Sequence, residues 1–273
     1  ISLGLVGSEM CIRDRDIFKE KLDLHHIPAL SNVLYSEDIL FPIADFYLKK
    51  ERWNEAIEVY EEMETIGALQ ERGAEYYQKL GYALQKSKKY AEAIGAYLKA
   101  DTLKPDNIWN NRHLAICYRL NRNYQAALSY YKKVEEATPE DTNVIFHIGS
   151  CLAELGQYEE AANYFFKLDF IESNCIKAWR GIGWCSFISR KYEQAMKYYE
   201  KIIEQKPLAI DYMNAGHVAW TMGDIQKAAA LYGKSITANG NRERFLEMFR
   251  KDEEALLKQG IQEEDIPLML DLL

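Results

Sequence analysis

The chain has 273 residues and a formal charge of −8, because 42 acidic residues outnumber 34 basic ones. It lacks the positive surplus that neutralises nucleic-acid phosphates, so we expect no nucleic-acid partner. Hydrophobic residues make up 48% and charged residues 28% of the sequence, which is typical of an ordered soluble protein. No apolar stretch reaches the roughly 18 residues of a membrane span, so we expect no membrane segment.

Residues 1–15 have the features of a foreign leader. Their codons can be written so that they reproduce a transposase-type sequencing-library adapter, which Leu5 to Arg15 resemble in translation. The apolar start has no basic segment before it and no small-residue cleavage site after it, which argues against a secretory signal. We expect residues 1–15 to lie outside the fold, the native N-terminus to be missing, and residues 16–36 to form a partial repeat or lead-in.

From residue 37 onward the sequence repeats with a period of about 34 residues. Pro105 and Pro139 are 34 residues apart, and Pro207 lies 68 residues further on. Three rows share this period: small residues, alanines, and large aromatics four residues after each alanine. The rows are Gly81, Ala115, Gly149, Gly183 and Gly216; Ala93, Ala127, Ala161, Ala195 and Ala228; and Tyr97, Tyr131, Phe165, Tyr199 and Tyr232. A fixed period of this length predicts stacked supersecondary units.

Each unit has the pattern of a helix hairpin. Apolar residues follow the helical period for about 13 residues, a short polar turn interrupts them, and the period resumes. We predict these turns at residues 87–89, 121–123, 155–157, 189–191 and 222–224. The small residues let the two helix backbones approach, and the aromatics fill the space one turn along.

These rows resemble the tetratricopeptide repeat family over six units: residues 37–73, 74–107, 108–141, 142–175, 176–208 and 209–242. The resemblance implies an all-α fold, a right-handed α-solenoid of about six helix-turn-helix repeats whose first helices form a concave inner face. Residues 243–273 are expected to form a C-terminal helical cap. An amphipathic segment begins near Arg244 and stops before Gly260, and the acids at 263–265 favour the start of a second short helix.

The spacing of the cysteines argues against a redox or metal centre. Cys117, Cys151 and Cys185 recur every 34 residues, which places them in adjacent repeats roughly 10 Å apart, the distance between packed helices. Disulfide partners need α-carbons within about 7 Å. We therefore expect small buried residues, and their unpaired state favours a reducing compartment such as the cytoplasm.

No motif typical of an enzyme is present. The sequence lacks zinc-ligand spacing, a phosphate loop and a nucleophile elbow. Gly181-Ile182-Gly183 lies within a predicted helix and has no third glycine, so it does not indicate a nucleotide site. His113 and His147 lie one repeat apart, and we expect them to line the inner face. We expect no catalytic residues, no cofactor and no metal.

The concave face is the candidate binding surface. The second, fifth, ninth and twelfth residues of each unit should point inward, opposite the packing rows. In the three central units these are Trp109, Arg112, Ile116 and Arg119; Asn143, Phe146, Ser150 and Ala153; and Lys177, Arg180, Trp184 and Phe187. Four are basic and none is acidic. Exposed Trp, Phe and Arg supply binding hot spots, although the same aromatics could instead cover gaps between repeats.

The sequence therefore predicts a non-catalytic protein-interaction scaffold. The predicted partner-binding groove comprises Trp109, Arg112, Ile116, Arg119, Asn143, Phe146, Lys177, Arg180 and Trp184, and its partner is a protein or peptide with an acidic segment. The first two units lack the Lys-then-Asn pair of a carboxylate clamp, so a chaperone-cofactor role is not implied. Two alternatives stay open: a docking or regulatory portion of a larger enzyme, and self-association through an exposed end of the array.

Overall fold

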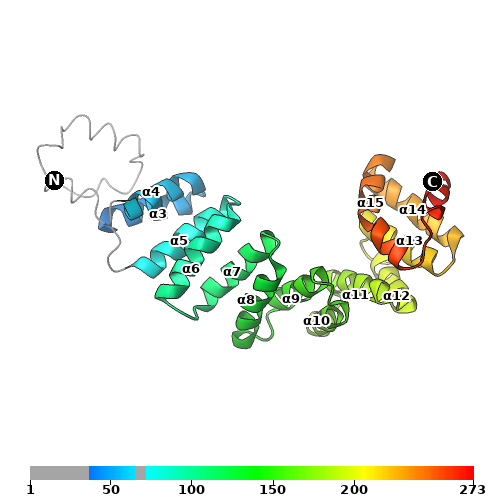
Figure 1. The fold of residues 1–273 in the computed structure, drawn as a ribbon, viewed down its shortest axis with the longest axis horizontal. Helices are drawn as coiled ribbons and strands as arrows, with labels where there is room; N and C mark the ends of the chain where they lie inside the picture. Colours follow the sequence, from blue (N-terminus) through cyan, green and yellow to red (C-terminus); the bar gives the residue numbers. More distant parts are fainter. Residues whose placement is uncertain (1–36, 66–71) are drawn as a thin grey trace, which may run out of the picture. The chain divides into compact units, whose positions relative to one another are not determined.

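The computed structural model describes residues 37–65 and 72–273. Within these ranges it contains fourteen α-helices, α3 to α16, and no β-strand (Figure 1). The predicted leader, residues 1–15, and the predicted lead-in, residues 16–36, lie outside the described residues. The chain is an all-α array of helix-turn-helix repeats, as the sequence predicts.

Helices pair in chain order, two to a repeat. The first helices are α3 (Glu37–Lys49), α5 (Gly73–Lys86), α7 (Ile108–Leu120), α9 (Thr142–Glu154), α11 (Ile176–Ile188) and α13 (Ala209–Thr221). The second helices are α4 (Trp53–Thr65), α6 (Tyr90–Leu103), α8 (Tyr124–Ala137), α10 (Tyr158–Ile171), α12 (Tyr192–Ile203) and α14 (Ile225–Asn239). They are followed by α15 (Arg242–Lys258) and α16 (Asp265–Asp271).

The five predicted turns are confirmed, because each falls between a first and a second helix at the expected three residues. The middle residue of every one has a positive φ: Lys88, Arg122, Gly156, Arg190 and Gly223. This left-handed conformation lets the chain reverse direction within three residues. Only two units use glycine there, although a Cβ in this conformation costs roughly 1–2 kcal/mol.

Polar side chains fix where several helices begin. The side chains of Asn123, Asp141, Asp224 and Asn241 each accept a hydrogen bond from a backbone N–H in the first turn of the following helix. These N–H groups have no partner within the helix, and such a cap is worth about 1 kcal/mol. These turn residues thus reverse the direction of the chain and also cap the N-terminus of the next helix.

The small and aromatic rows meet inside the repeats. A Cβ added to Gly81, Gly149, Gly183 or Gly216 would lie less than 3 Å from the aromatic ring of the second helix of its own unit. The alanines and the aromatics of the other two rows are all buried. The predicted reason for both rows, close approach of paired helices with a ring filling the interface, is therefore confirmed.

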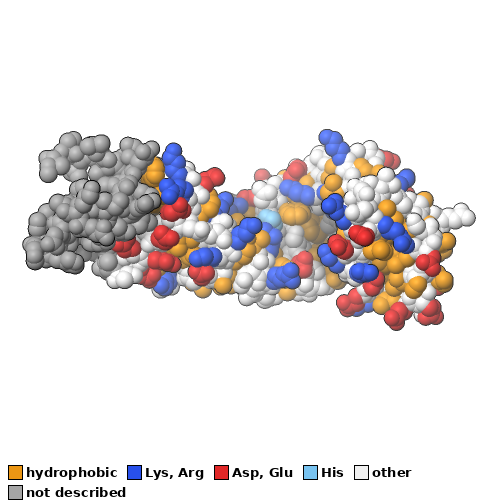
Figure 2. All heavy atoms as spheres, turned by 90° about the horizontal axis from the view of Figure 1, so that it is seen from above, with side chains coloured by type: hydrophobic (Ala, Val, Ile, Leu, Met, Phe, Trp, Pro, Cys, Tyr) orange, Lys and Arg blue, Asp and Glu red, His pale blue; other side chains and the backbone are white. Residues whose placement is uncertain are grey.

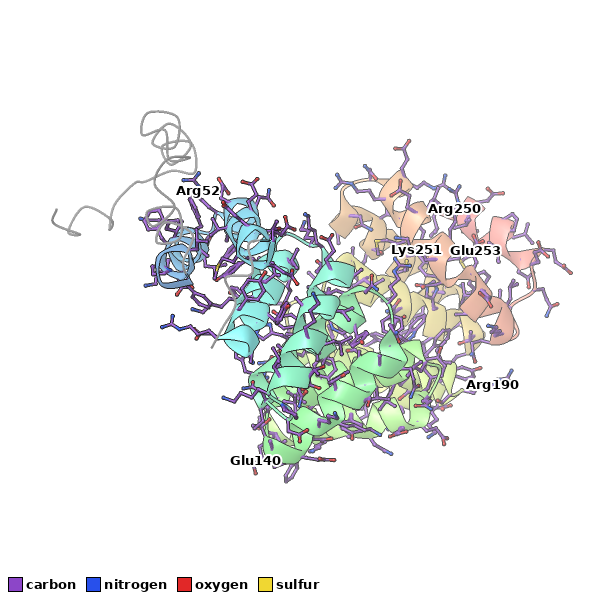
Figure 3. All side chains as sticks on the ribbon, turned by 60° about the vertical axis from the view of Figure 1, so that its left-hand side comes forward. Arg52, Glu140, Arg190, Arg250, Lys251 and Glu253 are labelled. Atoms are coloured by element: carbon purple, nitrogen blue, oxygen red, sulfur yellow. The ribbon has the colours of Figure 1, made fainter. Side chains whose placement is uncertain are left out.

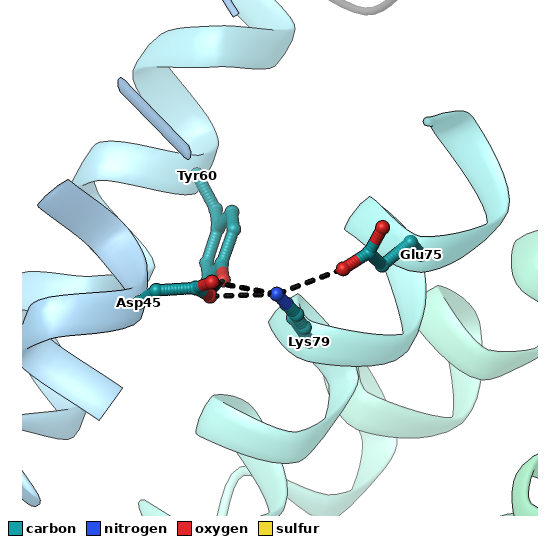
Figure 4. A network of polar contacts seen from close by, with 4 residues as sticks. All are labelled: Asp45, Tyr60, Glu75 and Lys79. Carbon is teal, nitrogen blue, oxygen red and sulfur yellow. Dashed lines mark hydrogen bonds and ion pairs between the residues drawn. The ribbon is translucent and has the colours of Figure 1, made fainter. Parts of the chain in front are cut away.

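Two compact units divide the chain within α7, between Cys117 and Tyr118. In the first unit an ion-pair network connects successive repeats (Figure 4). The Lys79 ammonium donates to both oxygens of Asp45 at 2.8 Å and lies 2.9 Å from Glu75, while the Tyr60 hydroxyl donates to Asp45 at 3.4 Å. Burial and then the Asp45 charge raise the pKa of Tyr60 above its usual value, which keeps its hydroxyl a donor.

In the second unit the C-terminal helices complete the core of the last repeat. Phe245 and Phe249 of α15 are fully buried and pack against Tyr232 of α14, with ring centroids 5.6 and 5.7 Å apart. The expected amphipathic helix and the second short helix are both present. Among the helices of the described residues, none combines the length and hydrophobicity that crossing a membrane requires.

Candidate functional site

The nine residues of the predicted groove divide between the two units, and each set is described within its own unit. In the first unit, Trp109 at the start of α7 is 43% exposed. Its ring lies 4.0 Å from that of His113 and 6.3 Å from that of Tyr82. Arg112 and Ile116, one and two turns further along α7, are half-buried. Trp109 thus forms the accessible edge of an aromatic cluster.

In the second unit, four of the predicted groove residues line one open pocket of about 410 Å³: Phe146, Lys177, Arg180 and Trp184. The inward positions Ser150 and Ala153 line it as well. The pocket lies on α9, α11 and the start of α13, which contributes Ile210, Asp211 and Asn214. In the space-filling view, hydrophobic side chains lie between Lys and Arg side chains where the surface is hollowed over α9 to α11 (Figure 2). This volume is typical of ligand-binding pockets.

Gly181 also lines the pocket, and no motif in the sequence points to it. Gly181 lies 34 residues after His147 and 68 after His113, so these residues share one position in three repeats. Each histidine covers the buried aromatic of the preceding second helix. Gly181 places no side chain on Phe165, whose buried ring packs against that of Phe146 at 6.0 Å. A Cβ at position 181 would lie 2.5 Å from the Phe165 ring. The helix therefore approaches Phe165 closely and leaves its ring as part of the pocket wall.

Arg180 is held in the pocket wall by an acidic partner on the next first helix. Its Nε and Nη2 donate to the two carboxylate oxygens of Asp211 at 2.7 and 2.8 Å. Asp211 is fully buried and also accepts the Leu208 backbone N–H at 2.7 Å. The hydrogen bonds from Arg180 to Asp211 raise the pKa of the guanidinium above its usual value. The positive charge expected of Arg180 is therefore largely compensated.

Lys177 is the less tightly paired cation of the pocket, because its acidic partner is exposed, whereas that of Arg180 is buried. Its ammonium lies 5.8 Å from the ring centroid of Phe146 and 3.4 Å from a carboxylate oxygen of Glu172. The side chains of Lys177 and Glu172 are 36% and 46% exposed, so this ion pair is weak and can exchange partners. A ligand carboxylate could replace Glu172 here at little cost.

Arg119 and Asn143 do not line this pocket. The Arg119 Nε donates to the Tyr131 hydroxyl at 3.4 Å, and Asn143 is exposed in the first turn of α9. Two acidic residues outside the twelve counted inward positions, Asp211 and Glu154, also line the pocket. Asp211 is the third residue of its unit, a position that the counting of inward residues leaves out.

His113 and His147 are half-buried, and each packs on an aromatic ring of the preceding second helix. The ring of His113 stacks on Tyr97 at 5.7 Å, and that of His147 stacks on Tyr131 at 5.4 Å. Burial, and then the charges of Lys86 and Arg112, lower the pKa of His113 to about 4. His113 is thus neutral near pH 7 and acts as a packing residue.

The cysteines of the described chain are free and buried, as expected of packing residues. Burial raises the pKa of Cys117 and Cys185 to about 12 and that of Cys151 to about 11. Such thiols carry almost no thiolate near neutral pH and are poor nucleophiles. Within residues 37–65 and 72–273, no group of three or more His, Cys, Asp and Glu side chains is placed to hold a metal ion.

Comparison with known protein families identifies the repeats. Models of the tetratricopeptide repeat match residues 40–72, 74–107, 119–185, 176–207 and 212–242, which together span more than half of the chain. No curated protein matches the sequence.

Several solved structures share the fold. A tetratricopeptide repeat protein from Parabacteroides merdae has a TM-score of 0.61 at 19% identity, over 86% of this chain and 97% of its own. A MamA fragment from Desulfovibrio magneticus RS-1 has a TM-score of 0.56 at 18% identity, over 62% of this chain and 97% of its own. YrrB, described as a repeat protein with an unusual peptide-binding site, has a TM-score of 0.55 at 21% identity, over 65% and 92%. At these identities the likeness concerns the fold alone.

Proposed function

The chain belongs to the tetratricopeptide repeat family, and from this premise we propose that it is a non-catalytic protein-interaction scaffold that binds a partner segment on the inner face of its first helices. The observation that supports this role is the pocket in which Phe146, Lys177, Arg180 and Trp184 meet. Stacked repeats provide extended surfaces of this kind for partners rather than reaction chemistry.

The aromatic side chains should supply most of the binding free energy. Trp184 and Phe146 are half-buried in the free protein, so a ligand side chain can remove their remaining surface from water. Anchors of this type typically cost about 2 kcal/mol or more when truncated. Lys177 should add an attraction for an acidic group that is worth about 1 kcal/mol or less and weakens with salt. The pocket should therefore favour a partner with an acidic segment, but the aromatic contacts should anchor that partner.

A pull-down from the native lysate tests the proposal. Trp109→Ala/Trp184→Ala should lose retained proteins relative to the wild type, because each unit then loses its accessible inner tryptophan. Phe170→Ala is the matched control, since Phe170 is 89% exposed and lies on the second helix α10. Identical sets of proteins from the wild type and the double variant would contradict binding on this face. Light scattering at several concentrations measures whether the same substitutions change self-association.

A further inference from the structure

We propose that the partner segment of the α9–α11–α13 pocket is an amphipathic helix, with aromatic residues at positions i and i+4 and an acidic residue at i+7 on one face. This inference rests on the proposed function and specifies the chemistry of its ligand. It comes from the last repeat, where the chain itself covers the inner face with a helix of this pattern.

Helix α15 covers the inward positions of α13. His217 and Trp220, the ninth and twelfth residues of the last unit, are 0% and 5% exposed. The Phe249 ring lies 5.4 Å from His217 and 6.5 Å from Trp220, and an oxygen of Asp252 lies 3.5 Å from the His217 Nε2. Phe249 and Asp252 are three residues apart and therefore share a face of α15.

The opposite side of α15 is charged, which makes the helix amphipathic. Arg250 and Lys251 lie on this side of the helix (Figure 3), and both are exposed. Phe245, Phe249 and Asp252 occupy positions i, i+4 and i+7 of the covered face. A helix that docks in a groove is recognised by this spacing of anchors.

The C-terminal end of α15 contacts the fifth repeat only at the turn between α11 and α12. The Gln259 side chain donates to the Ile188 carbonyl at 3.2 Å and accepts from the Tyr192 hydroxyl at 2.9 Å. The Arg190 guanidinium donates to the Lys258 carbonyl at 3.0 Å. These contacts hold α15 against the turn between α11 and α12. The inner positions Lys177, Arg180 and Trp184, earlier on α11, stay open as the pocket.

The pocket offers matching partners for the same pattern. Trp184 holds the ninth position of its unit, as His217 does in the last unit, so the first aromatic residue of a ligand helix, at position i, can pack on Trp184. Phe146, Phe165 and Ile210 provide the remaining apolar wall. Lys177 lies seven residues before Trp184, about 10 Å along the helix, which is also the span from i to i+7 in a ligand helix. A ligand carboxylate at that distance can replace the exposed Glu172.

The test uses the full chain and a fluorescein-labelled peptide with the sequence of residues 242–258, which carries this pattern. We expect saturable binding by fluorescence anisotropy, and helical carbon chemical shifts for the ¹³C-labelled peptide when bound. Trp184→Ala should weaken the affinity about tenfold or more. Lys177→Glu should weaken it a few-fold at low salt and less at high salt. Phe170→Ala, outside the pocket, should bind the peptide like the wild type. A peptide with Phe249→Ala, which lacks one aromatic anchor, should bind more weakly. Melting temperatures verify that each protein variant folds.

Absence of binding, an extended bound peptide, or equal affinity for the wild type and Trp184→Ala would overturn the proposal. Equal affinity would also arise if the peptide merely replaced the resident α15 on α13. If the pull-down set depends on Trp184 while the helical peptide does not bind, the pocket still binds partners and only the helical pattern is wrong. The two proposals therefore fail separately.

Discussion

Replacing Gly181 with alanine should destabilise the second unit, against the usual preference of helices for alanine. Gly181 lies inside α11, where Gly→Ala normally stabilises by roughly 0.5–1 kcal/mol. Here the new Cβ would lie 2.5 Å from Cδ2 and 2.6 Å from Cγ of Phe165. Cγ lies on the axis of χ2 rotation, so turning the ring about χ2 leaves this contact in place, and relief requires a new χ1 rotamer in a packed interface or a shift of the helix backbone.

The expected magnitude follows from two opposing terms. Overpacking of a buried interface costs about 1–3 kcal/mol, and the gain in helix propensity offsets part of this cost. We expect a net loss of about 1–2 kcal/mol. Gly233→Ala is the matched control, since Gly233 also lies inside a helix and an added Cβ there meets nothing within 4 Å. That substitution should stabilise the chain by up to about 1 kcal/mol.

Urea unfolding measures the change in the free energy of unfolding of the two variants, and hydrogen exchange shows which helices lose protection. Protection should fall in α10, α11 and their neighbours for Gly181→Ala, because coupling between repeats is with the nearest neighbours. The displaced Phe165 ring should also reduce binding in the pocket. If Gly181→Ala stabilised the chain as much as Gly233→Ala, the close approach of α11 to Phe165 would be refuted.

Two further predictions concern pH and the turns. Because the pKa of His113 is lowered to about 4 from its usual 6.5, the unfolded chain binds more protons between these values. The contribution of His113 to the stability of the first unit should therefore be complete above about pH 6.5 and fall towards pH 4 by at most about 3 kcal/mol. In a series of unfolding midpoints measured against pH, His113→Phe should reduce the slope between these values. An unchanged slope would contradict the lowered pKa of His113. Lys88→Gly should stabilise the same unit by about 1 kcal/mol in urea unfolding, because Lys88 has a φ of 62°; a loss of stability would show that the lysine side chain contributes more than the turn conformation costs.

The sequence by itself determined the repeat, the paired helices and the positions of the five turns within the hairpins, from 87–89 to 222–224. These features recur along the chain, and each depends on residues close together in one unit. The spacing of Gly149 and Phe165, for example, expresses a contact between the two helices of one hairpin. Because the same contact recurs in each unit, it produces a periodic residue pattern that can be recognised in a single sequence.

The tertiary structure alone decided what the inner face presents. Arg180 meets Asp211 from the next repeat, 31 residues away, and this pairing compensates a charge that the sequence predicts to be free. Gly181 lies directly against Phe165 of the preceding repeat, and both residues line the pocket. The Phe249 ring closes the face over His217 because α15 turns back across α13. Each contact joins different repeats through residues that do not recur, and therefore no periodic pattern in the sequence records them.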